Sequence, residues 1–320
     1  MTQQTLIQVQ QLSRQYGPIS AVNDISFEVQ RGEVLGFLGP NGAGKSTTMK
    51  MISGNLAPSM GSVKICGIDL LDQPKQAKAQ IGYLPEQPPV YRELTVDEYL
   101  HFCAKINRIE KNNIRSSVSK AKQRCGLEHV SHRLIGNLSK GYQQRVGIAQ
   151  AIIHSPAIVV LDEPTVGLDP IQIREIRDLI RELGEDHGVI LSTHILPEVQ
   201  MTCDRVQIIR GGKLVYQDTM ANINQDAQVN SVILGLAQNV SDTELEKLPD
   251  VKQIEHLSPN RWRLQLATGS QLNPKLAEHI VAQQWGLVEL TPEQQNLEQF
   301  FLDITTSEQA ATETIAEPSV

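Results

Sequence analysis

The chain has 320 residues, a length sufficient for two hydrophobic cores. Its composition, 40% hydrophobic and 20% charged, is that of an ordinary globular protein. The net charge of −7 weighs against nucleic acid as a partner, because proteins that bind polyanions usually present a basic surface. No apolar run approaches the length of a membrane span, and the four cysteines form no C-x-x-C pair, so we expect reduced thiols rather than zinc or disulfides.

The first diagnostic element is the apolar run Val34–Leu38, which predicts a strand buried on both faces. The stretch GPNGAGKST follows it and fits G-x-x-x-x-G-K-[ST], the phosphate-binding P-loop pattern, in the context that this pattern requires. Glycines let backbone N–H groups face phosphate oxygens, and a helix starting near Gly44 directs its positive end at the same anion. We expect Lys45 to reach the β- and γ-phosphates and Ser46 to ligate Mg²⁺. The predicted phosphate-binding residues are Gly39, Pro40, Asn41, Gly42, Ala43, Gly44, Lys45, Ser46 and Thr47.

A helical insert is predicted from about Thr95 to Ile153, where no buried strand pattern occurs. The stretch Thr95-Val96-Asp97-Glu98 is a capping box that opens one of its helices.

Two carboxylates follow the next apolar run, Ala157–Leu161. A carboxylate at the end of a buried strand is well placed to hold Mg²⁺ through water, which suits Asp162. A second carboxylate beside it can polarise an attacking water, which suits Glu163. The pair therefore predicts nucleotide hydrolysis when it accompanies a P-loop.

An amphipathic helix and two strands complete the predicted core. Asp169 can cap the helix and Pro170 occupies its first position, while Gly188 is expected to end it. Its apolar face is formed by Ile173, Ile176, Ile180 and Leu183. The runs Val189–Leu191 and Val206–Ile209 predict further buried strands. Strands alternating with helices indicate an α/β fold with a mainly parallel sheet.

The composition changes near Asp218, and a small α+β domain is predicted beyond it. Its expected elements follow the order strand, helix, strand, strand, helix, strand: Ser231–Leu236, Asp242–Leu248, Val251–Leu257, Arg261–Ala267, Pro274–Gln284 and Gly286–Leu290. This order is typical of a ferredoxin-like domain. A helix from Pro292 to about Ile304 and a polar, disordered tail, Thr305–Val320, are expected to follow. The predicted domains are 1–225, with the helical insert at about 95–153, then 226–304 and the tail.

The stretch LSKGYQQR, Leu138 to Arg145, precedes the carboxylate pair, and with these motifs in this order the chain resembles the ATP-binding subunit of an ABC transporter. The resemblance covers about residues 5–220 and is nearest to drug-export and gliding-motility subunits. The family signature is normally LSGGQ, and here Lys140 and Tyr142 depart from it. The resemblance implies that Ser139 and Gly141 contact the γ-phosphate of ATP held by a second subunit.

Three further motifs match the family. The resemblance implies that Tyr16 stacks on adenine. It also implies that Val166-Gly167-Leu168-Asp169 is the D-loop, which brings Asp169 to the nucleotide interface. The stretch Ser192-Thr193-His194 is similar to the switch region, in which His194 touches the γ-phosphate.

One motif departs from the family pattern. The Q-loop normally supplies a glutamine that senses Mg²⁺ and the attacking water, whereas Glu86 stands at the aligned position and Gln87 follows it. A carboxylate can coordinate Mg²⁺ but cannot donate a hydrogen bond as an amide does. We expect Glu86 to be a metal ligand, and a shifted register that uses Gln87 stays open.

The resemblance implies a head-to-tail dimer that closes on ATP and drives an integral-membrane permease at the cytoplasmic face of the cell membrane. The second ATPase position holds either an identical chain or a paired subunit. Two alternatives remain: a soluble ABC ATPase that acts on DNA or ribosomes, and a nucleotide-binding regulator with degraded catalysis.

Overall fold

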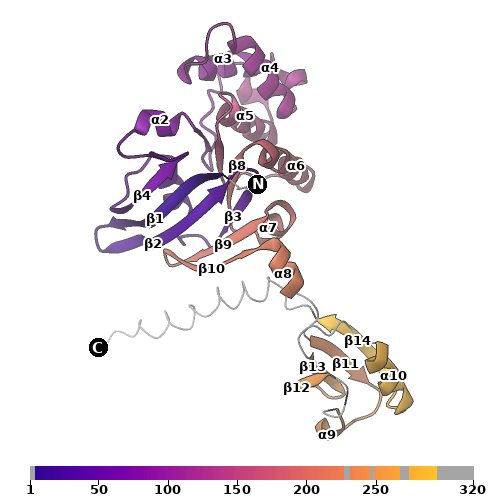
Figure 1. Cartoon of the computed structure of the whole chain (residues 1–320). Helices are drawn as coiled ribbons and strands as arrows, with labels where there is room; N and C mark the ends of the chain where they lie inside the picture. Colours follow the sequence, from indigo (N-terminus) through magenta and orange to yellow (C-terminus); the bar gives the residue numbers. More distant parts are fainter. Residues whose placement is uncertain (1–3, 227–230, 246–247, 249, 267–273, 294–320) are drawn as a thin grey trace, which may run out of the picture. The chain divides into compact units, whose positions relative to one another are not determined.

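The computed structural model describes residues 4–226, 231–245, 248, 250–266 and 274–293 (Figure 1). The chain divides into two compact units, Met1–Met220 and Ala221–Val320.

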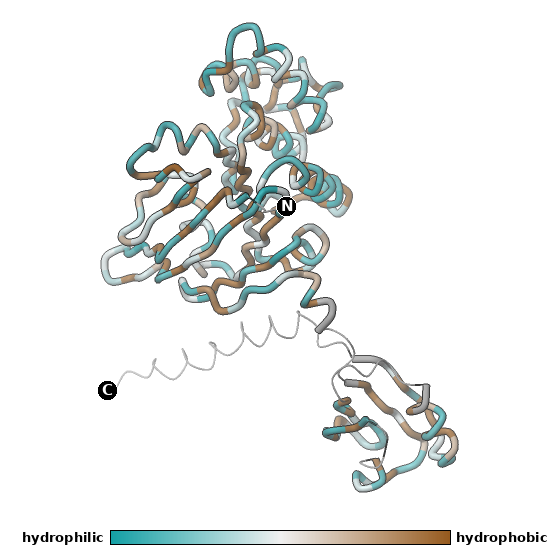
Figure 2. Tube along the Cα trace, in the orientation of Figure 1, coloured by the Kyte–Doolittle hydropathy of each residue, from teal (hydrophilic) through white to brown (hydrophobic). Residues whose placement is uncertain are grey.

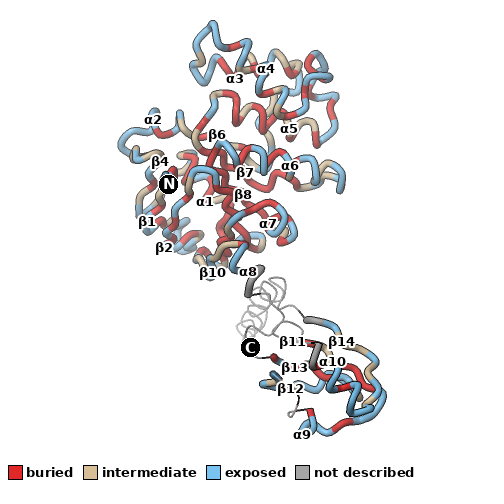
Figure 3. The backbone as a smooth tube through the Cα atoms, turned by 45° about the vertical axis from the view of Figure 1, so that its right-hand side comes forward, coloured by how far each residue is buried: buried red, intermediate tan, exposed pale blue. Residues whose placement is uncertain are grey.

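A six-stranded sheet forms the centre of the first unit. Its strand order is β10-β9-β3-β8-β7-β6. The five strands from β9 to β6 are parallel, and β10 is antiparallel to β9. The bounds are β3 Val34–Leu38, β6 Ile81–Leu84, β7 Ile158–Asp162, β8 Gly188–Thr193, β9 Arg205–Arg210 and β10 Lys213–Thr219. Every residue of β3, β7 and β8 is buried, and the apolar runs within these strands predicted this for their apolar residues. In Figure 3, β7 and β8 are shown as buried.

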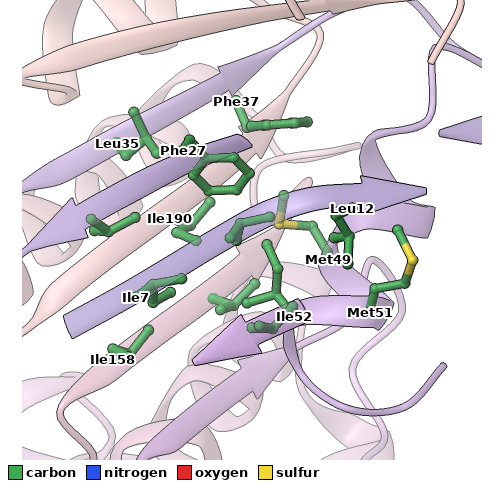
Figure 4. Packing of buried hydrophobic residues seen from close by; sticks show 14 of the residues in the cluster. Ile7, Leu12, Phe27, Leu35, Phe37, Met49, Met51, Ile52, Ile158 and Ile190 are labelled. Atoms are coloured by element: carbon green, nitrogen blue, oxygen red, sulfur yellow. The ribbon is translucent and has the colours of Figure 1, made fainter. Parts of the chain in front are cut away.

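A second, antiparallel sheet has the order β2-β1-β4-β5. Its strands are β1 Thr5–Tyr16, β2 Ile19–Gln30, β4 Met60–Ile65 and β5 Ile68–Asp69. Helix α1, Lys45–Ile52, contributes Met49 to the core that the strands of both sheets share, together with Ile7, Phe27, Phe37 and Ile190 (Figure 4). The sequence patterns did not predict this sheet.

The helical insert contains α3 Val96–Ile106, α4 Ile114–Arg124 and α5 Lys140–Ile152, with two short 3₁₀ helices, η1 Glu128–Val130 and η2 Ile135–Asn137. The predicted capping box is confirmed: the Glu98 N–H donates to Thr95 Oγ1 at 3.2 Å, and the Thr95 N–H donates to Glu98 Oε2 at 2.9 Å. A separate short helix, α2, spans Pro74–Lys78.

Helix α6, Pro170–Asp186, begins as predicted, because Asp169 Oδ1 accepts from the Ile171 and Gln172 N–H groups. The helix ends at Asp186, just before Gly188 as predicted, but Gly188 does not cap it, because its φ angle is not positive. His187 is the C-cap, and Gly188 is the first residue of β8, where a Cβ would lie 3.0 Å from the Gln30 carbonyl oxygen. The glycine thus serves close strand packing. Two more helices follow, α7 Leu196–Thr202 and α8 Met220–Asp226.

The second unit contains a four-stranded antiparallel sheet of order β12-β13-β11-β14. Its elements run β11 Ser231–Leu236, α9 Asp242–Leu245, β12 Val251–Ser258, β13 Arg261–Leu266, α10 Pro274–Ala282 and β14 Leu287–Glu293. The core of this unit includes Trp262, Leu234 and Leu264. In the first unit, hydrophobic residues follow the central strands (Figure 2).

The helix predicted to begin at Pro292 does not begin there. Pro292 belongs to β14 and pairs with Val232, a position that proline tolerates because β14 is an edge strand. The remainder of that predicted helix and the predicted tail, residues 294–320, lie outside the described residues.

Candidate active site

The P-loop connects β3 to α1, and its backbone requires glycine. Gly42 and Gly44 have positive φ angles of 82° and 108°, which side chains other than hydrogen disfavour. A Cβ at Gly44 would also lie 2.5 Å from the Ala21 carbonyl oxygen. The loop can therefore follow this path only with the glycines that the motif supplies.

Lys45 opens α1, and its residue is only 6% exposed. Its Nζ donates to the carbonyl oxygens of Gly39 at 2.8 Å and Pro40 at 3.2 Å. The same Nζ lies 3.3 Å from Glu163 Oε1. The P-loop lysine is therefore held in the loop and paired with one of the two predicted carboxylates.

Asp162 is the last residue of β7 and pairs in register with Ser192 of β8. Ser192 Oγ donates to Asp162 Oδ1 at 2.7 Å. Burial raises the pKa of the Asp162 carboxyl, and hydrogen bonds from Ser192 and Ser46 oppose that shift. Strand register and the P-loop thus place two hydroxyls on the first carboxylate.

Glu163 follows β7 in a left-handed backbone conformation, with φ of 50°. Its N–H donates to the Ser192 carbonyl at 2.9 Å, and its Oε2 lies 2.8 Å from Nδ1 of His194. Non-glycine residues in this conformation store about 1–3 kcal/mol of strain and occur preferentially at functional sites. Lys45, Glu163 and His194 therefore meet from three separate segments, while the histidine side chain stays 39% exposed.

The other predicted nucleotide-site residues lie on different elements. Tyr16 ends β1, is 45% exposed, and has the Arg14 guanidinium 4.8 Å from its ring centre. Ser139 caps α5, and Asp169 caps α6. At Gly141 a Cβ would lie 2.6 Å from the end of the Gln172 side chain, which would have to move to make room for it. Within the described residues, no hydrogen bond or ion pair joins Ser139, Gly141 or Asp169 to the P-loop.

Glu86 and Gln87 lie in the loop that follows β6, and both are exposed. Strand β6 pairs with β7, so this loop begins beside the strand that leads to the two carboxylates. Neither side chain forms a hydrogen bond or an ion pair among the residues that the structure describes.

Sequence analysis missed one carboxylate close to this cluster. Glu198 of α7 is 2% exposed and accepts hydrogen bonds from Thr165, at 2.5 Å, and from Thr193, at 2.7 Å. Its partners come from the segments that follow β7 and β8, which are far apart in the sequence, so no local pattern marked it. A charged residue on a buried helix face is rare unless it has partners.

A P-loop beyond one strand of a parallel sheet and two carboxylates beyond another define a P-loop nucleotide hydrolase. The family model described as ABC transporter matches residues 22–166. A second model, described as an AAA domain, putative AbiEii toxin, Type IV TA system, matches residues 132–201.

Relatives define the family further. The uncharacterized ABC transporter ATP-binding protein YxlF of Bacillus subtilis is 34% identical over 80% of this chain and 85% of its own. The bacitracin transport ATP-binding protein BcrA of Bacillus licheniformis is 33% identical over 94% of this chain and 97% of its own. The solved structure of CbiO1 from Clostridium perfringens, described as part of the transporter complex cbiONQ, is 29% identical with a TM-score of 0.64, covering 69% of this chain and 91% of that chain.

The chain therefore belongs to the ATP-binding proteins of ABC transporters and is an ATPase subunit of that family. This confirms the resemblance that the motifs carried. In the part of the chain that the structure describes, no helix combines the length and the apolar character needed to cross a bilayer.

Proposed function

We propose that the protein hydrolyses ATP to power an exporter, bound to an integral-membrane permease at the cytoplasmic face of the cell membrane. The observation that carries this proposal is the cluster of Lys45, Glu163 and His194 beside the P-loop. The bacitracin transport relative supports export, and the description of CbiO1 as part of a complex supports a partner chain.

The nucleotide site is proposed to combine two subunits, either two copies of this chain or this chain and a paired subunit. The P-loop, Gly39 to Thr47, would bind the triphosphate of one ATP, and Tyr16 would stack on its adenine. Ser139 and Gly141, at the start of α5, would contact the γ-phosphate held by the other subunit, and Asp169 would approach the same interface. ATP would then close the dimer.

Mg²⁺ fits the residues at the end of β7. Asp162 supplies a carboxylate and Ser46 a hydroxyl, already joined to each other, and oxygen ligands are those that Mg²⁺ prefers. Glu86, from the neighbouring strand's loop, is the proposed additional ligand, with Gln87 as the alternative. The bound ion would neutralise charge on the phosphates.

Glu163 is the proposed base, because its carboxylate can orient the attacking water and take its proton. His194 donates through Nδ1 to that carboxylate, so Nε2 would donate to the γ-phosphate only in the doubly protonated imidazolium form. Lys45 would stabilise the negative charge on the transferred group. The proposed site thus brings one ammonium, one imidazole and one base to a single phosphorus centre.

The proposed domains are 1–225 for ATP hydrolysis and 226–304 for an accessory role, followed by a tail. A ferredoxin-like fold for the accessory domain is supported by its strand order, β14-β11-β13-β12, and by its strand–helix–strand–strand–helix–strand sequence. Its assigned role is dimer support or regulation.

The first test is Glu163→Gln, which keeps the shape of the side chain but removes the base. We expect ATP binding to persist while turnover falls by about 10²-fold or more. The variant should accumulate as an ATP-bound dimer in size-exclusion chromatography. Turnover at the wild-type rate would remove Glu163 from its role.

The second test recovers the partner. Tagged Glu163→Gln chain, with ATP, is used to capture proteins from detergent-solubilised membranes. Recovery of a polytopic membrane protein supports the proposal that this chain is the ATPase subunit of an exporter. Recovery of ribosomes or DNA-bound proteins, with no chain in the membrane fraction, would instead favour the soluble ATPase.

A further inference from the structure

We propose that Glu198 is a positioning residue for ATP hydrolysis, because its buried carboxylate joins the two backbone segments that carry Glu163 and His194. The proposal rests on the catalytic roles assigned to these two residues. It adds a residue that no motif of the sequence analysis contained.

One oxygen of Glu198 holds the segment after β7. Thr165 Oγ1 donates to Glu198 Oε1 at 2.5 Å, and Thr165 is 2% exposed. Thr165 belongs to the tight turn that begins at Glu163, because the Val166 N–H donates to the Glu163 carbonyl at 3.3 Å. The bond therefore fixes the turn two residues beyond the base.

The other oxygen holds the segment after β8. Thr193 Oγ1 donates to Glu198 Oε2 at 2.7 Å and accepts from the Ile195 N–H at 3.1 Å. Thr193 and Ile195 are the two neighbours of His194 in the chain. Both neighbours of the histidine are thus tied, directly or through one hydroxyl, to the same carboxylate.

The energetics favour a positional role. Glu198 is 2% exposed, and among the described residues no lysine, arginine or histidine forms an ion pair with it. A buried carboxylate whose donors are neutral hydroxyls costs desolvation free energy, and replacing the glutamate together with both threonines by apolar side chains of similar shape could be nearly neutral for folding. Stability alone therefore does not account for a glutamate at this position.

The strained backbone conformation of Glu163 must be held by surrounding contacts, and the hydrogen bonds to Glu198 are among them. A residue at φ of 50° keeps that conformation only when its surroundings determine it strongly. Two hydrogen bonds to one carboxylate set the turn of Glu163 and the segment of His194 relative to each other. Misplacing these groups by about 1 Å can lower a rate by about 10²-fold.

The experiment measures kcat and KM for ATP in the full chain. Glu198→Met removes both acceptors at similar volume, and kcat should fall by about tenfold or more while KM stays within about twofold. Glu198→Gln should restore most of kcat, because the threonine hydroxyls can accept from the amide as well as donate. Adding Thr193→Val to Glu198→Met should cause no further loss, since the bond is already absent.

The matched control is Glu33→Met. Glu33 is a second buried carboxylate, 9% exposed, paired with Arg205 at 2.6 Å and remote from the motifs of the site. Its loss should lower stability in urea without changing kcat of the folded protein. If Glu198→Met does not fold, Thr165→Val and Thr193→Val replace it, each with the same expected fall in kcat.

An unchanged kcat in folded Glu198→Met, or an equal fall in Glu33→Met, would overturn the proposal. Glu163→Gln is measured in parallel to separate the two hypotheses. If Glu163→Gln is inactive and Glu198→Met is fully active, only the positioning role fails. If Glu163→Gln keeps wild-type turnover, the proposed function itself fails.

Discussion

At the scale of single residues, His187 connects the helical insert to the core. Its Nδ1 lies 2.6 Å from the Pro156 carbonyl oxygen, so Nδ1 carries the proton and donates. Its Nε2 lies 3.4 Å from Nη1 of Arg124, which belongs to α4. Burial lowers the pKa of His187, because the charged form loses water. The imidazole thus accepts from the arginine only while it is neutral.

This arrangement predicts loss of stability in acid. The unfolded chain takes up the proton near the ordinary pKa of 6.5, and the folded chain takes it up only at lower pH. Between these values the unfolded state binds more protons, so stability falls as the pH drops below about 6.5. His187→Asn should weaken that dependence in urea titrations at about pH 8 and pH 5.5. His154, whose pKa burial also lowers, should keep part of it, and an unchanged dependence would contradict the role of His187.

The residues that sequence analysis could identify are those whose chemistry depends on neighbours in the chain. Lys45 lies in a contiguous loop, and Asp162 and Glu163 are adjacent, so their patterns are visible in the sequence. Glu198 was missed because its partners come from two strands' ends, which only the sheet brings together.

At the scale of elements, the start of α3 depends on its capping box, because three hydrogen bonds join Thr95 and Glu98. The helix opens the insert, which lies between the P-loop strand and the carboxylate strand in the sequence. Its first turn therefore sets where the insert begins.

Thr95→Ala should lower the free energy of unfolding by about 1 kcal/mol, the usual cost of losing an N-cap. Ser116→Ala is the control, because within the described part of the chain that exposed hydroxyl donates to the Asn113 carbonyl and accepts from no helix N–H group. It should change stability by less than about 0.5 kcal/mol. Urea denaturation of both variants measures the difference, and equal values would show that the cap contributes nothing.

Strands were predictable from the sequence where burial on both faces alone determined their composition. Strands β3, β7 and β8 are buried on both faces, and each contains an apolar run, Val34–Leu38, Ile158–Leu161 and Val189–Leu191, although β7 ends in Asp162 and β8 in Ser192-Thr193. Strands β1 and β2 mix buried and exposed positions and contain irregular register, so no clear period marks them. Pro292 was assigned to a helix because the sequence does not reveal that its strand lies at an edge.

At the scale of the whole molecule, the two units have separate cores. The first core is built from both sheets and α1, and the second is built around Trp262. All predicted nucleotide-binding residues lie in the first unit, Met1–Met220. Each unit therefore has what it needs to fold by itself.

A fragment of residues 1–226 should fold and bind ATP with a Kd within about twofold of the full chain. Circular dichroism and nucleotide titration measure folding and binding. Insolubility, or loss of ATP binding, would show that the second unit completes the first. A change in turnover at unchanged affinity would assign the accessory domain to regulation or dimer support.

The ion pair between Lys45 and Glu163 has a thermodynamic consequence for the reaction. If Lys45 binds the nucleotide as proposed, its ammonium would serve two anions, the Glu163 carboxylate and the phosphates. The two would compete, so ATP would have to displace the carboxylate, and part of its binding free energy would offset that exchange. With the proposed roles, the exchange would also link substrate to the reaction, because the Glu163 carboxylate would be released from its cation only when a phosphate takes its place.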